Sequence, residues 1–439
     1  MEMSTLATNN SLWKNRSFVR LWCGTLFSAM ADGAFFILLN WYIVNAMGSG
    51  AILGTTLICL SIPRLLFMLA GGVAADRLNR KWIMFSSLLV RGIILACFSL
   101  LMLQGNSDWF PVSLYVMAAL FGTVDAFFWP ARSSILPSLV SREQLAPANS
   151  LMELCHQISM VAGPVVTALL IGTVPYPTMF MILACTFFVG TLFVLSLHSH
   201  SYTKDTTSES TTESRASSYF KDIVGGIRFT YSIPILALIL TTSLFTNMMF
   251  SGPVNMIIPI HVNDLGWDGS AFSSLSTSLG VGMIIGGILT ALCKGFRGNF
   301  MLLPVILGCM GVGISSYYFI EELSFGLVSH FLIGMALSMT NIPFITYIQS
   351  IVPANMLGRV MSLLSLMSIG FGPVSYALCS FLLAKNITTP RLLLFFGGIM
   401  FVSISLSLFF FRSFRQMEQH PNWKRTAMEE QQLPATLSS

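Results

Sequence analysis

Gly71 to Lys81 reads GGVAADRLNRK and separates two long apolar runs of the chain. Within eleven residues it brings together one acidic and three basic side chains, in a sequence that is otherwise poor in charge. The runs on either side, 51–75 and 82–103, are each long enough to cross a hydrocarbon core about 30 Å thick, which takes roughly 20 helical residues. The stretch is therefore expected to form a short turn between two membrane helices.

The composition is that of a protein embedded in a membrane. Of the 439 residues, 54% are hydrophobic and 9% are charged, whereas soluble proteins carry about 25% charged residues. Twelve apolar runs are long enough to span a bilayer, which predicts an all-α polytopic membrane protein with twelve transmembrane helices. We place these runs at 18–45, 51–75, 82–103, 110–131, 147–172, 178–197, 234–260, 270–293, 300–320, 325–349, 360–384 and 391–411.

Basic residues are distributed unevenly over the loops. With the N-terminus inside, most of the 23 Lys and Arg residues lie on cytoplasmic segments, and the outer loops carry only Lys385 and Arg391. Cytoplasmic loops are enriched in basic residues, so both termini are predicted to be cytoplasmic, in a bacterial inner membrane. The net charge of +5 thus indicates topology and not nucleic-acid binding. Residues 1–17 are polar and precede a run long enough to span, so no cleaved signal peptide is expected.

Cysteine and phosphate-binding patterns exclude several kinds of chemistry. All eight cysteines fall within or at the edge of the apolar runs, without a CxxC pair and without histidines at ligand spacing. Neither disulfides nor a metal site is expected. The chain also lacks a GxxxxGK[ST] loop, so ATP-driven pumping by this chain is not expected. We expect no cofactor, and a proton gradient as the energy source of a monomeric protein surrounded by membrane lipids.

A polar stretch divides the chain near its middle. His198 to Ser218 is rich in Ser and Thr and has no apolar periodicity, which predicts a flexible linker. Phe220, Ile223, Val224 and Ile227 then recur at helical spacing, which predicts an amphipathic helix at the membrane surface. The predicted organisation is an N-terminal segment (1–17), a six-helix bundle (18–197), a linker with its amphipathic helix (198–232), a second six-helix bundle (233–411) and a tail (412–439).

The two predicted bundles resemble each other in sequence. Pro130 to Ser150 is similar to Pro343 to Ser362, and the pair Gly163-Pro164 recurs as Gly372-Pro373 at nearly the same offset. An offset that is held over separate motifs indicates a duplication of six helices, which is how many transporters are built. Chance similarity between apolar helices is the alternative.

The opening stretch resembles motif A of the major facilitator superfamily, which lies on the cytoplasmic turn between the second and third membrane helices. Asn79 stands where the family usually has glycine, and both residues tolerate left-handed backbone. A degraded copy follows in the second half, with Gly286 and Lys294 kept and Thr290 in place of the acid. The residues that match the motif are Gly72, Asp76, Arg77, Arg80 and Lys81.

The resemblance to motif A implies a conformational gate. In the superfamily this motif stabilises the outward-facing state at the cytoplasmic seam between the halves. By resemblance Asp76 is expected to pair at that seam, with Arg132 as its partner. The alternative is a basic loop that only sets topology, but topology requires neither Gly72 nor Asp76.

The fifth predicted span resembles the antiporter motif of the same superfamily in part. Gly163-Pro164 is present, while Ser150, Ser159 and Thr167 are among the small residues that stand in place of glycines. Small residues preserve close helix packing, and Pro164 is expected to break the helix. Residues 127–164 further resemble the branch with macrolide-efflux pumps and enterobactin exporters, which implies export of amphipathic small molecules.

Four charged residues lie deep inside predicted spans, where an unpaired charge costs several kcal/mol. At 1.5 Å per residue, Asp32 and Arg64 lie roughly 21 and 18 Å from the cytoplasmic ends of spans one and two, which permits an ion pair. Arg91 and Asp125 lie roughly 15 and 10 Å deep in spans three and four and permit a second pair. Glu153, with His156 one turn away, forms either a shallow proton relay or a hydrated pair at the end of span five.

Each of these pairs has two interpretations. In the first, a carboxylate exchanges its partner for a proton or a cationic substrate, which couples transport to a proton gradient. In the second, a permanent ion pair stabilises the N-terminal bundle. The functional interpretation is favoured for Asp32, because first spans line the central cavity in the superfamily. The structural interpretation is favoured for Arg91, because third spans in the superfamily are peripheral.

The second half offers neutral polar groups instead. Asn247 and Asn341 are candidates for contact with substrate, and an interhelical hydrogen bond explains each of them equally well. The sequence therefore predicts a proton-coupled exporter of amphipathic drugs or a siderophore, working by alternating access between two halves. The alternatives are a lipid flippase or an importer of the same superfamily. A polytopic membrane enzyme is a remote alternative, because the outer loops are too short for a catalytic cluster and the only long loop is low in complexity.

Overall fold

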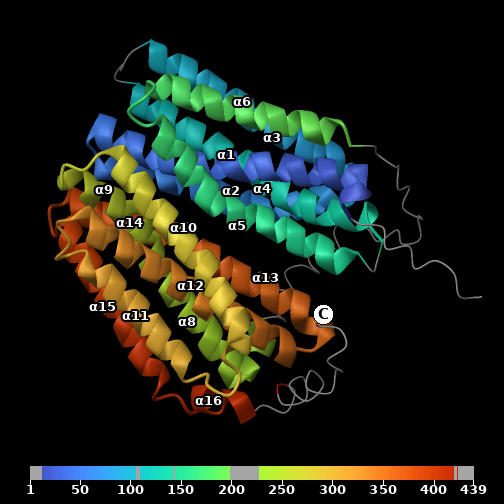
Figure 1. Ribbon diagram of the computed structural model, residues 1–439, viewed down its shortest axis with the longest axis vertical. Coiled ribbons are helices and arrows are strands. Elements are labelled where there is room, and N and C mark those ends of the chain that lie inside the picture. The colour runs from blue at the N-terminus through green and yellow to red at the C-terminus, as the bar shows by residue number, and fades with distance from the viewer. Residues whose placement is uncertain (1–11, 105–108, 142–143, 198–226, 420–422, 424–439) are drawn as a thin grey trace, which may run out of the picture. The chain divides into compact units, whose positions relative to one another are not determined.

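The computed structural model describes residues 12–104, 109–141, 144–197, 227–419 and 423. All regular structure in these ranges is helical, as lipid demands, because a helix pairs its backbone groups internally and lipid offers them no partner. The chain divides into two compact units (Figure 1). We call them the N-terminal unit, within 1–46 and 55–204, and the C-terminal unit, within 47–54 and 205–439.

Six long helices account for most of the N-terminal unit, with short 3-10 turns η1 (Leu12–Lys14) and η2 (Leu136–Ser138) beside them. They are α1 (Arg16–Met47), α2 (Gly50–Arg77), α3 (Arg80–Leu103), α4 (Phe110–Ile135), α5 (Leu145–Leu170) and α6 (Tyr176–Leu195). The C-terminal unit contains α8 (Pro234–Phe250), η3 (Ser251–Ile257), α9 (Ile258–Asp264), α10 (Gly269–Leu292), η4 (Lys294–Phe296), α11 (Leu302–Ser316), α12 (Leu323–Ile351), α13 (Ala354–Gly370), α14 (Gly372–Ala384), α15 (Pro390–Leu408), α16 (Arg412–Arg415) and η5 (Met417–Gln419).

The helices lie where the apolar runs predicted them. Within the described residues, 11 helical segments are long and apolar enough to cross a membrane. The predicted span at 300–320 corresponds to α11, an apolar helix of only 15 residues. The predicted positions are confirmed, while the count of twelve depends on this shorter helix.

The two units repeat the same helix contacts. In the N-terminal unit α3 packs against α4 and α6, and in the C-terminal unit α11 packs against α12 and α15 (Figure 1). A glycine allows the closest approach at matching places: a Cβ atom on Gly122 of α4 would overlap the carbonyl oxygen of Leu60 on α2, and one on Gly334 of α12 would overlap that of Leu279 on α10. The predicted six-helix repeat is thus visible in the packing.

Helices continue through several prolines, and the break predicted at Pro164 is wrong. Helix α5 continues through Pro164, and α12 continues through Pro343. Pro253 lies in the π-helical turn η3, which joins α8 and α9 into one segment. Gly163 instead provides close packing, because its Cβ would lie 2.7 Å from the backbone nitrogen of Ala34 on α1. A helix can continue past a proline when neighbouring groups satisfy the freed carbonyls.

The turn between α2 and α3 is closed by side chains of its own motif. Asn79 has φ −67° and ψ 112°, and its side chain accepts a hydrogen bond from the backbone N–H of Lys81. Asn79 therefore does not use the left-handed backbone that it tolerates, and it serves instead as the N-cap of α3. Arg80 Nε donates to the carbonyl of Ala75 (3.2 Å), and Lys81 Nζ donates to that of Leu197 (2.6 Å).

Two adjacent glycines in this motif differ in their surroundings. A Cβ on Gly71 would lie 2.6 Å from the carbonyl oxygen of Ala126 on α4, whereas a Cβ on Gly72 would meet no atom within 4 Å. The glycine that lets α2 approach α4 is therefore Gly71. The side chains of Asp76 and Arg77 lie outside the described ones, and so does the predicted pair between Asp76 and Arg132.

The corresponding turn between α10 and α11 has a left-handed backbone. Lys294, Gly295 and Phe296 have φ of 49°, 66° and 58°. Such values are uncommon for residues other than glycine. They persist only where the surrounding structure holds them in place.

The C-terminal tail packs against this turn. Glu418 accepts a hydrogen bond from the backbone N–H of Phe300 at 2.8 Å. Trp423 is buried, and its ring lies 5.2 Å from that of Phe300 and 5.3 Å from that of Tyr347, between ring centroids. The guanidinium of Arg297 lies 4.5 Å from the centre of the same indole. The tail thus stabilises a turn that has lost its acidic motif residue.

The predicted amphipathic helix of the linker lies mostly outside the described residues. Only its last part is described, where residues 227–232 are helical and lead into α8.

Candidate functional site

Four charged side chains meet inside the N-terminal unit, one each from α1, α2, α3 and α4. Arg91 Nη1 donates to both oxygens of Asp32, at 2.7 and 3.0 Å, and to Oδ1 of Asp125 at 2.9 Å. Arg64 Nε contacts the other oxygen of Asp125 at 3.0 Å. The result is a chain of contacts in the order Asp32, Arg91, Asp125, Arg64, which we call the charge cluster.

The arrangement confirms one predicted pair and corrects the other. Arg91 pairs with Asp125 as predicted. The predicted pair of Asp32 and Arg64 is wrong, because Asp32 pairs with Arg91 and Arg64 pairs with Asp125. The rise along a helix gave the depth of each residue, whereas the direction in which a side chain points depends on how each helix is rotated in the bundle.

Arg91 is held more firmly than any other member of the charge cluster. Its side chain has no exposed surface, and Nη2 donates to the hydroxyl of Ser28 at 3.1 Å. Three phenylalanine rings surround the guanidinium, with centroids 4.8 Å (Phe187), 5.0 Å (Phe128) and 5.7 Å (Phe121) away. Ring faces stabilise a desolvated cation, so this arginine has a fixed position.

Exposure distinguishes the inner from the outer members. The side chains of Arg91 and Asp125 are 0% and 6% exposed, whereas those of Asp32 and Arg64 are 25% and 42% exposed. When all four are ionised their charges cancel, so a proton on Asp32 leaves one excess positive charge. Asp32 is therefore the more exposed of the two carboxylates, and Arg91 contacts the buried Asp125 as well.

Two further predicted residues lie near the end of α4. The guanidinium of Arg132 lies 4.7 Å from the centre of the Trp129 ring, and it is close enough to Glu153 on α5 for their charges to interact. Glu153 is exposed. The side chain of His156 is not among the described ones, so the proposed relay with Glu153 stays a prediction.

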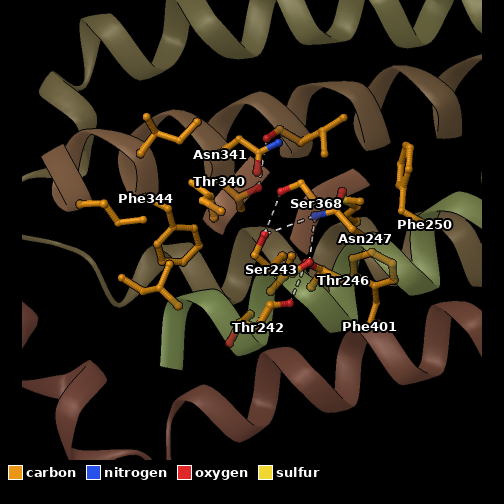
Figure 2. A pocket seen from close by; sticks show the side chains of 17 residues that line it. Thr242, Ser243, Thr246, Asn247, Phe250, Thr340, Asn341, Phe344, Ser368 and Phe401 are labelled. Carbon is orange, nitrogen blue, oxygen red and sulfur yellow. Dashed lines mark hydrogen bonds between the residues drawn. The ribbon is translucent and has the colours of Figure 1, made fainter. Parts of the chain in front are cut away.

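The C-terminal unit encloses a pocket without charged side chains (Figure 2). Its volume is about 270 Å³, and it lies between α8, α11, α12, α13 and α15. It is lined by Ile239, Thr242, Ser243, Thr246, Asn247, Phe250, Leu307, Met310, Leu337, Thr340, Asn341, Phe344, Ile345, Ile348, Leu364, Ser368 and Phe401. We call it the neutral pocket.

Hydrogen bonds within α8 arrange the polar side of the neutral pocket. Asn247 Nδ2 donates to the carbonyl of Ser243 at 2.8 Å and to its hydroxyl at 3.3 Å. The hydroxyls of Ser243 and Ser368 lie 3.4 Å apart and connect α8 to α13. Figure 2 shows these groups together, with Phe250, Phe344 and Phe401 among the labelled apolar side chains of the lining.

Both asparagines predicted to contact substrate line this pocket. The alternative interpretation, an interhelical hydrogen bond, does not describe Asn247, whose bonds stay within α8. The hydroxyls of Ser243, Thr246, Thr340 and Ser368 were not predicted. The sequence could have predicted the polar face of α8, because Ser243, Thr246 and Asn247 recur at helical spacing in an apolar helix.

An all-helical bundle of membrane length, with buried charges in one unit and a neutral pocket in the other, has the features of a polytopic membrane transporter. The sequence matches the family model of the Major Facilitator Superfamily over residues 21–373, and the chain belongs to this family. It is accordingly a transporter and not an enzyme.

Relatives of the chain within this family include named efflux pumps. The chain is 25% identical to macrolide efflux protein A of Streptococcus pyogenes over 363 residues, which cover 80% of this chain and 85% of that protein. It is 24% identical to the multidrug efflux pump Tap of Mycolicibacterium fortuitum over 372 residues, covering 80% and 87%. The fold resembles the crystal structure of nucleoside transporter NupG, with a TM-score of 0.65 at 15% identity over 91% of this chain and 98% of that one.

Proposed function

We propose that this transporter is a proton-coupled exporter of amphipathic small molecules, either drugs or a siderophore. It exchanges protons for substrate by alternating access, in a bacterial cytoplasmic membrane with both termini inside. Two efflux pumps among its relatives support export, and the excess of basic residues on alternate loops supports the orientation. The observation that carries proton coupling is Asp32, a partly exposed carboxylate that shares the buried Arg91 with Asp125.

Asp32 and Arg91 provide the coupling step in this proposal. Ionised Asp32 accepts two hydrogen bonds from Arg91. When a proton binds to Asp32, one carboxylate charge is lost, and Arg91 then depends on Asp125 alone for compensation. Two conformations that expose Asp32 to different sides of the membrane would bind this proton with different affinity. Substrate release and proton uptake are linked through that difference.

The motif at the end of α2 is the conformational gate in this proposal. Gly72, Asp76, Arg77, Arg80 and Lys81, with Arg132, act at the cytoplasmic ends of the helices. The bonds of Arg80 and Lys81 to backbone carbonyls support this role, because they fix the turn on which the other motif residues lie.

Transport in proteoliposomes tests the coupling. Purified protein is reconstituted, and uptake of a radiolabelled macrolide is measured with and without an imposed pH gradient. We expect Asp32→Asn to abolish the acceleration by the pH gradient and to keep substrate exchange at equal pH, since the amide keeps the shape but cannot bind the proton.

Asp268→Asn is the matched control for this substitution. Asp268 caps α10 outside the spans, and its pKa is lowered because the backbone N–H of Ala271 and the hydroxyl of Ser270 donate to it. Asparagine also caps helices, so this variant should transport as the wild type does. Acceleration by the pH gradient that survives in Asp32→Asn contradicts the proposal.

A further inference from the structure

The neutral pocket differs from the charge cluster in what it can bind. None of the 17 residues that line it carries a charge at neutral pH. A cation or an anion entering this pocket would lose hydration without gaining a counter-ion, which is costly in an apolar surrounding. The occupant that fits is therefore uncharged.

The polar groups of the pocket offer both donors and acceptors: the amide of Asn341 has both, and several hydroxyl oxygens offer lone pairs. The hydroxyl of Thr246 donates to the carbonyl of Thr242 at 2.9 Å, and that of Thr340 donates to the carbonyl of Ala336 at 2.8 Å. Since each hydroxyl proton is used within its own helix, the oxygens of Thr246 and Thr340 offer their lone pairs as acceptors. Asn247 uses its amide nitrogen on Ser243, which leaves its Oδ1 as a third acceptor.

These acceptors favour a ligand that donates hydrogen bonds, and the donors beside them favour one that also accepts, as a hydroxyl group does. An uncharged group that brings several donors is an alcohol, a sugar or a phenol, whereas ethers and esters bring none. Phe250, Phe344 and Phe401 provide apolar surface for the carbon skeleton of such a group. The volume of about 270 Å³ is below the range of roughly 300–1,000 Å³ for sites that hold a whole drug. It suits one ring of a larger molecule.

We propose that the neutral pocket binds the uncharged, hydroxyl-bearing part of the transported amphiphile, such as a sugar or phenol ring. This assignment rests on the proposed function, because it names the class of molecule that the exporter carries. The rest of the amphiphile lies outside this pocket, and the charge cluster is not needed to recognise the hydroxylated ring.

Equilibrium binding to purified protein tests the assignment. The probe is radiolabelled octyl β-glucoside below its micellar concentration, in a detergent that has no hydroxyl groups, and the comparison ligand is the same glucoside with all hydroxyls methylated. Thr246→Val and Thr340→Val each remove one acceptor at nearly constant shape. We expect each to weaken glucoside binding by about fivefold, and the double variant to weaken it further, as the loss of a hydrogen bond would.

The controls separate recognition from general effects. Thr277→Val on α10 removes a hydroxyl that donates to a carbonyl in its own helix in the same way, at 2.9 Å, and this residue does not line the pocket. It should leave glucoside binding unchanged, and no variant should alter binding of the methylated ligand. Equal binding of the two ligands to the wild type, unchanged glucoside binding in the double variant, or stronger competition by octyltrimethylammonium would overturn the assignment.

The binding test and the transport test fail independently. Binding is measured without a pH gradient, so it does not depend on Asp32 or on proton coupling. If the glucoside does not bind while transport still responds to the pH gradient, the pocket assignment is wrong and the exporter proposal stands. If the glucoside binds as expected but transport by the wild type does not respond to the pH gradient, the exporter proposal fails instead.

Discussion

The two units share a helical plan but differ in how they use the interior. In the N-terminal unit, α1 to α4 place four charges in contact, and the innermost of them, Arg91, has no exposed surface. In the C-terminal unit the matching helices α8 and α12 line a pocket of hydroxyls, amides and phenyl rings without any charge. Duplication therefore preserved the packing of helices and not the chemistry of the interior. The difference suggests that protons are handled in one unit and the hydroxylated part of the cargo in the other.

The largest effect on stability is expected at Arg91. Arg91→Met should lower the free energy of unfolding by about 3–5 kcal/mol, because it leaves the carboxylates of Asp32 and Asp125 without their shared partner. Unfolding of the detergent-solubilised protein by heat or denaturant measures the loss. Arg64→Met should cost far less, since that side chain is 42% exposed. Equal losses in the two variants would show that the charge cluster has no buried centre.

A smaller effect tests the symmetry of the helix packing. Gly122→Ala and Gly334→Ala should each cost about 1–3 kcal/mol, because the added methyl group meets a backbone carbonyl that cannot move freely. Gly72→Ala is the control, since a Cβ there meets nothing within 4 Å. It should be neutral or slightly stabilising, as alanine is in most helices. If only one of the two packed glycines tolerates alanine, the two interfaces are not equivalent.

The smallest effect is expected at the turn that the C-terminal tail covers. Glu418→Gln should have little effect on the unfolding temperature, because the amide oxygen can still accept from Phe300. Trp423→Ala should lower the unfolding temperature by a few degrees, corresponding to about 1–2 kcal/mol for an aromatic contact at the end of a chain. Limited proteolysis near residues 294–300 gives a second measurement. Unchanged cleavage in Trp423→Ala would mean that the tail does not stabilise this turn.

Apolar run length predicted the helices well, and less of the site followed from it. The run at 82–103 became α3 at Arg80–Leu103, because hydrophobic length is set by the thickness of the bilayer. The depth of a residue along the helix axis also follows from sequence spacing, and on this basis Arg91 and Asp125 were correctly paired. The contact of Asp32 with Arg91 was missed, because it depends on rotation and order of helices that sequence spacing does not contain.

Local hydrogen bonding explains the remaining differences. Asn79 was noted only as a residue that tolerates left-handed backbone, whereas it caps α3 through its side chain, a role that depends on where the helix begins. Pro164 was expected to break α5, but the helix continues past it to Leu170. Asn247 and Asn341 were identified from their polarity alone, whereas the acceptor character of the pocket required the positions of Thr246 and Thr340.

The division of roles between the units is tested most directly by proton release on substrate binding. A macrolide is added at saturating concentration to purified protein in weakly buffered detergent solution, and the pH change is recorded against a blank without protein. The wild type and the double variant Thr246→Val/Thr340→Val, once saturated, should release protons, while Asp32→Asn should release none. Release that is undiminished in Asp32→Asn, or that disappears in the saturated pocket variant, would contradict the assignment of protons to the N-terminal unit and of cargo recognition to the C-terminal unit.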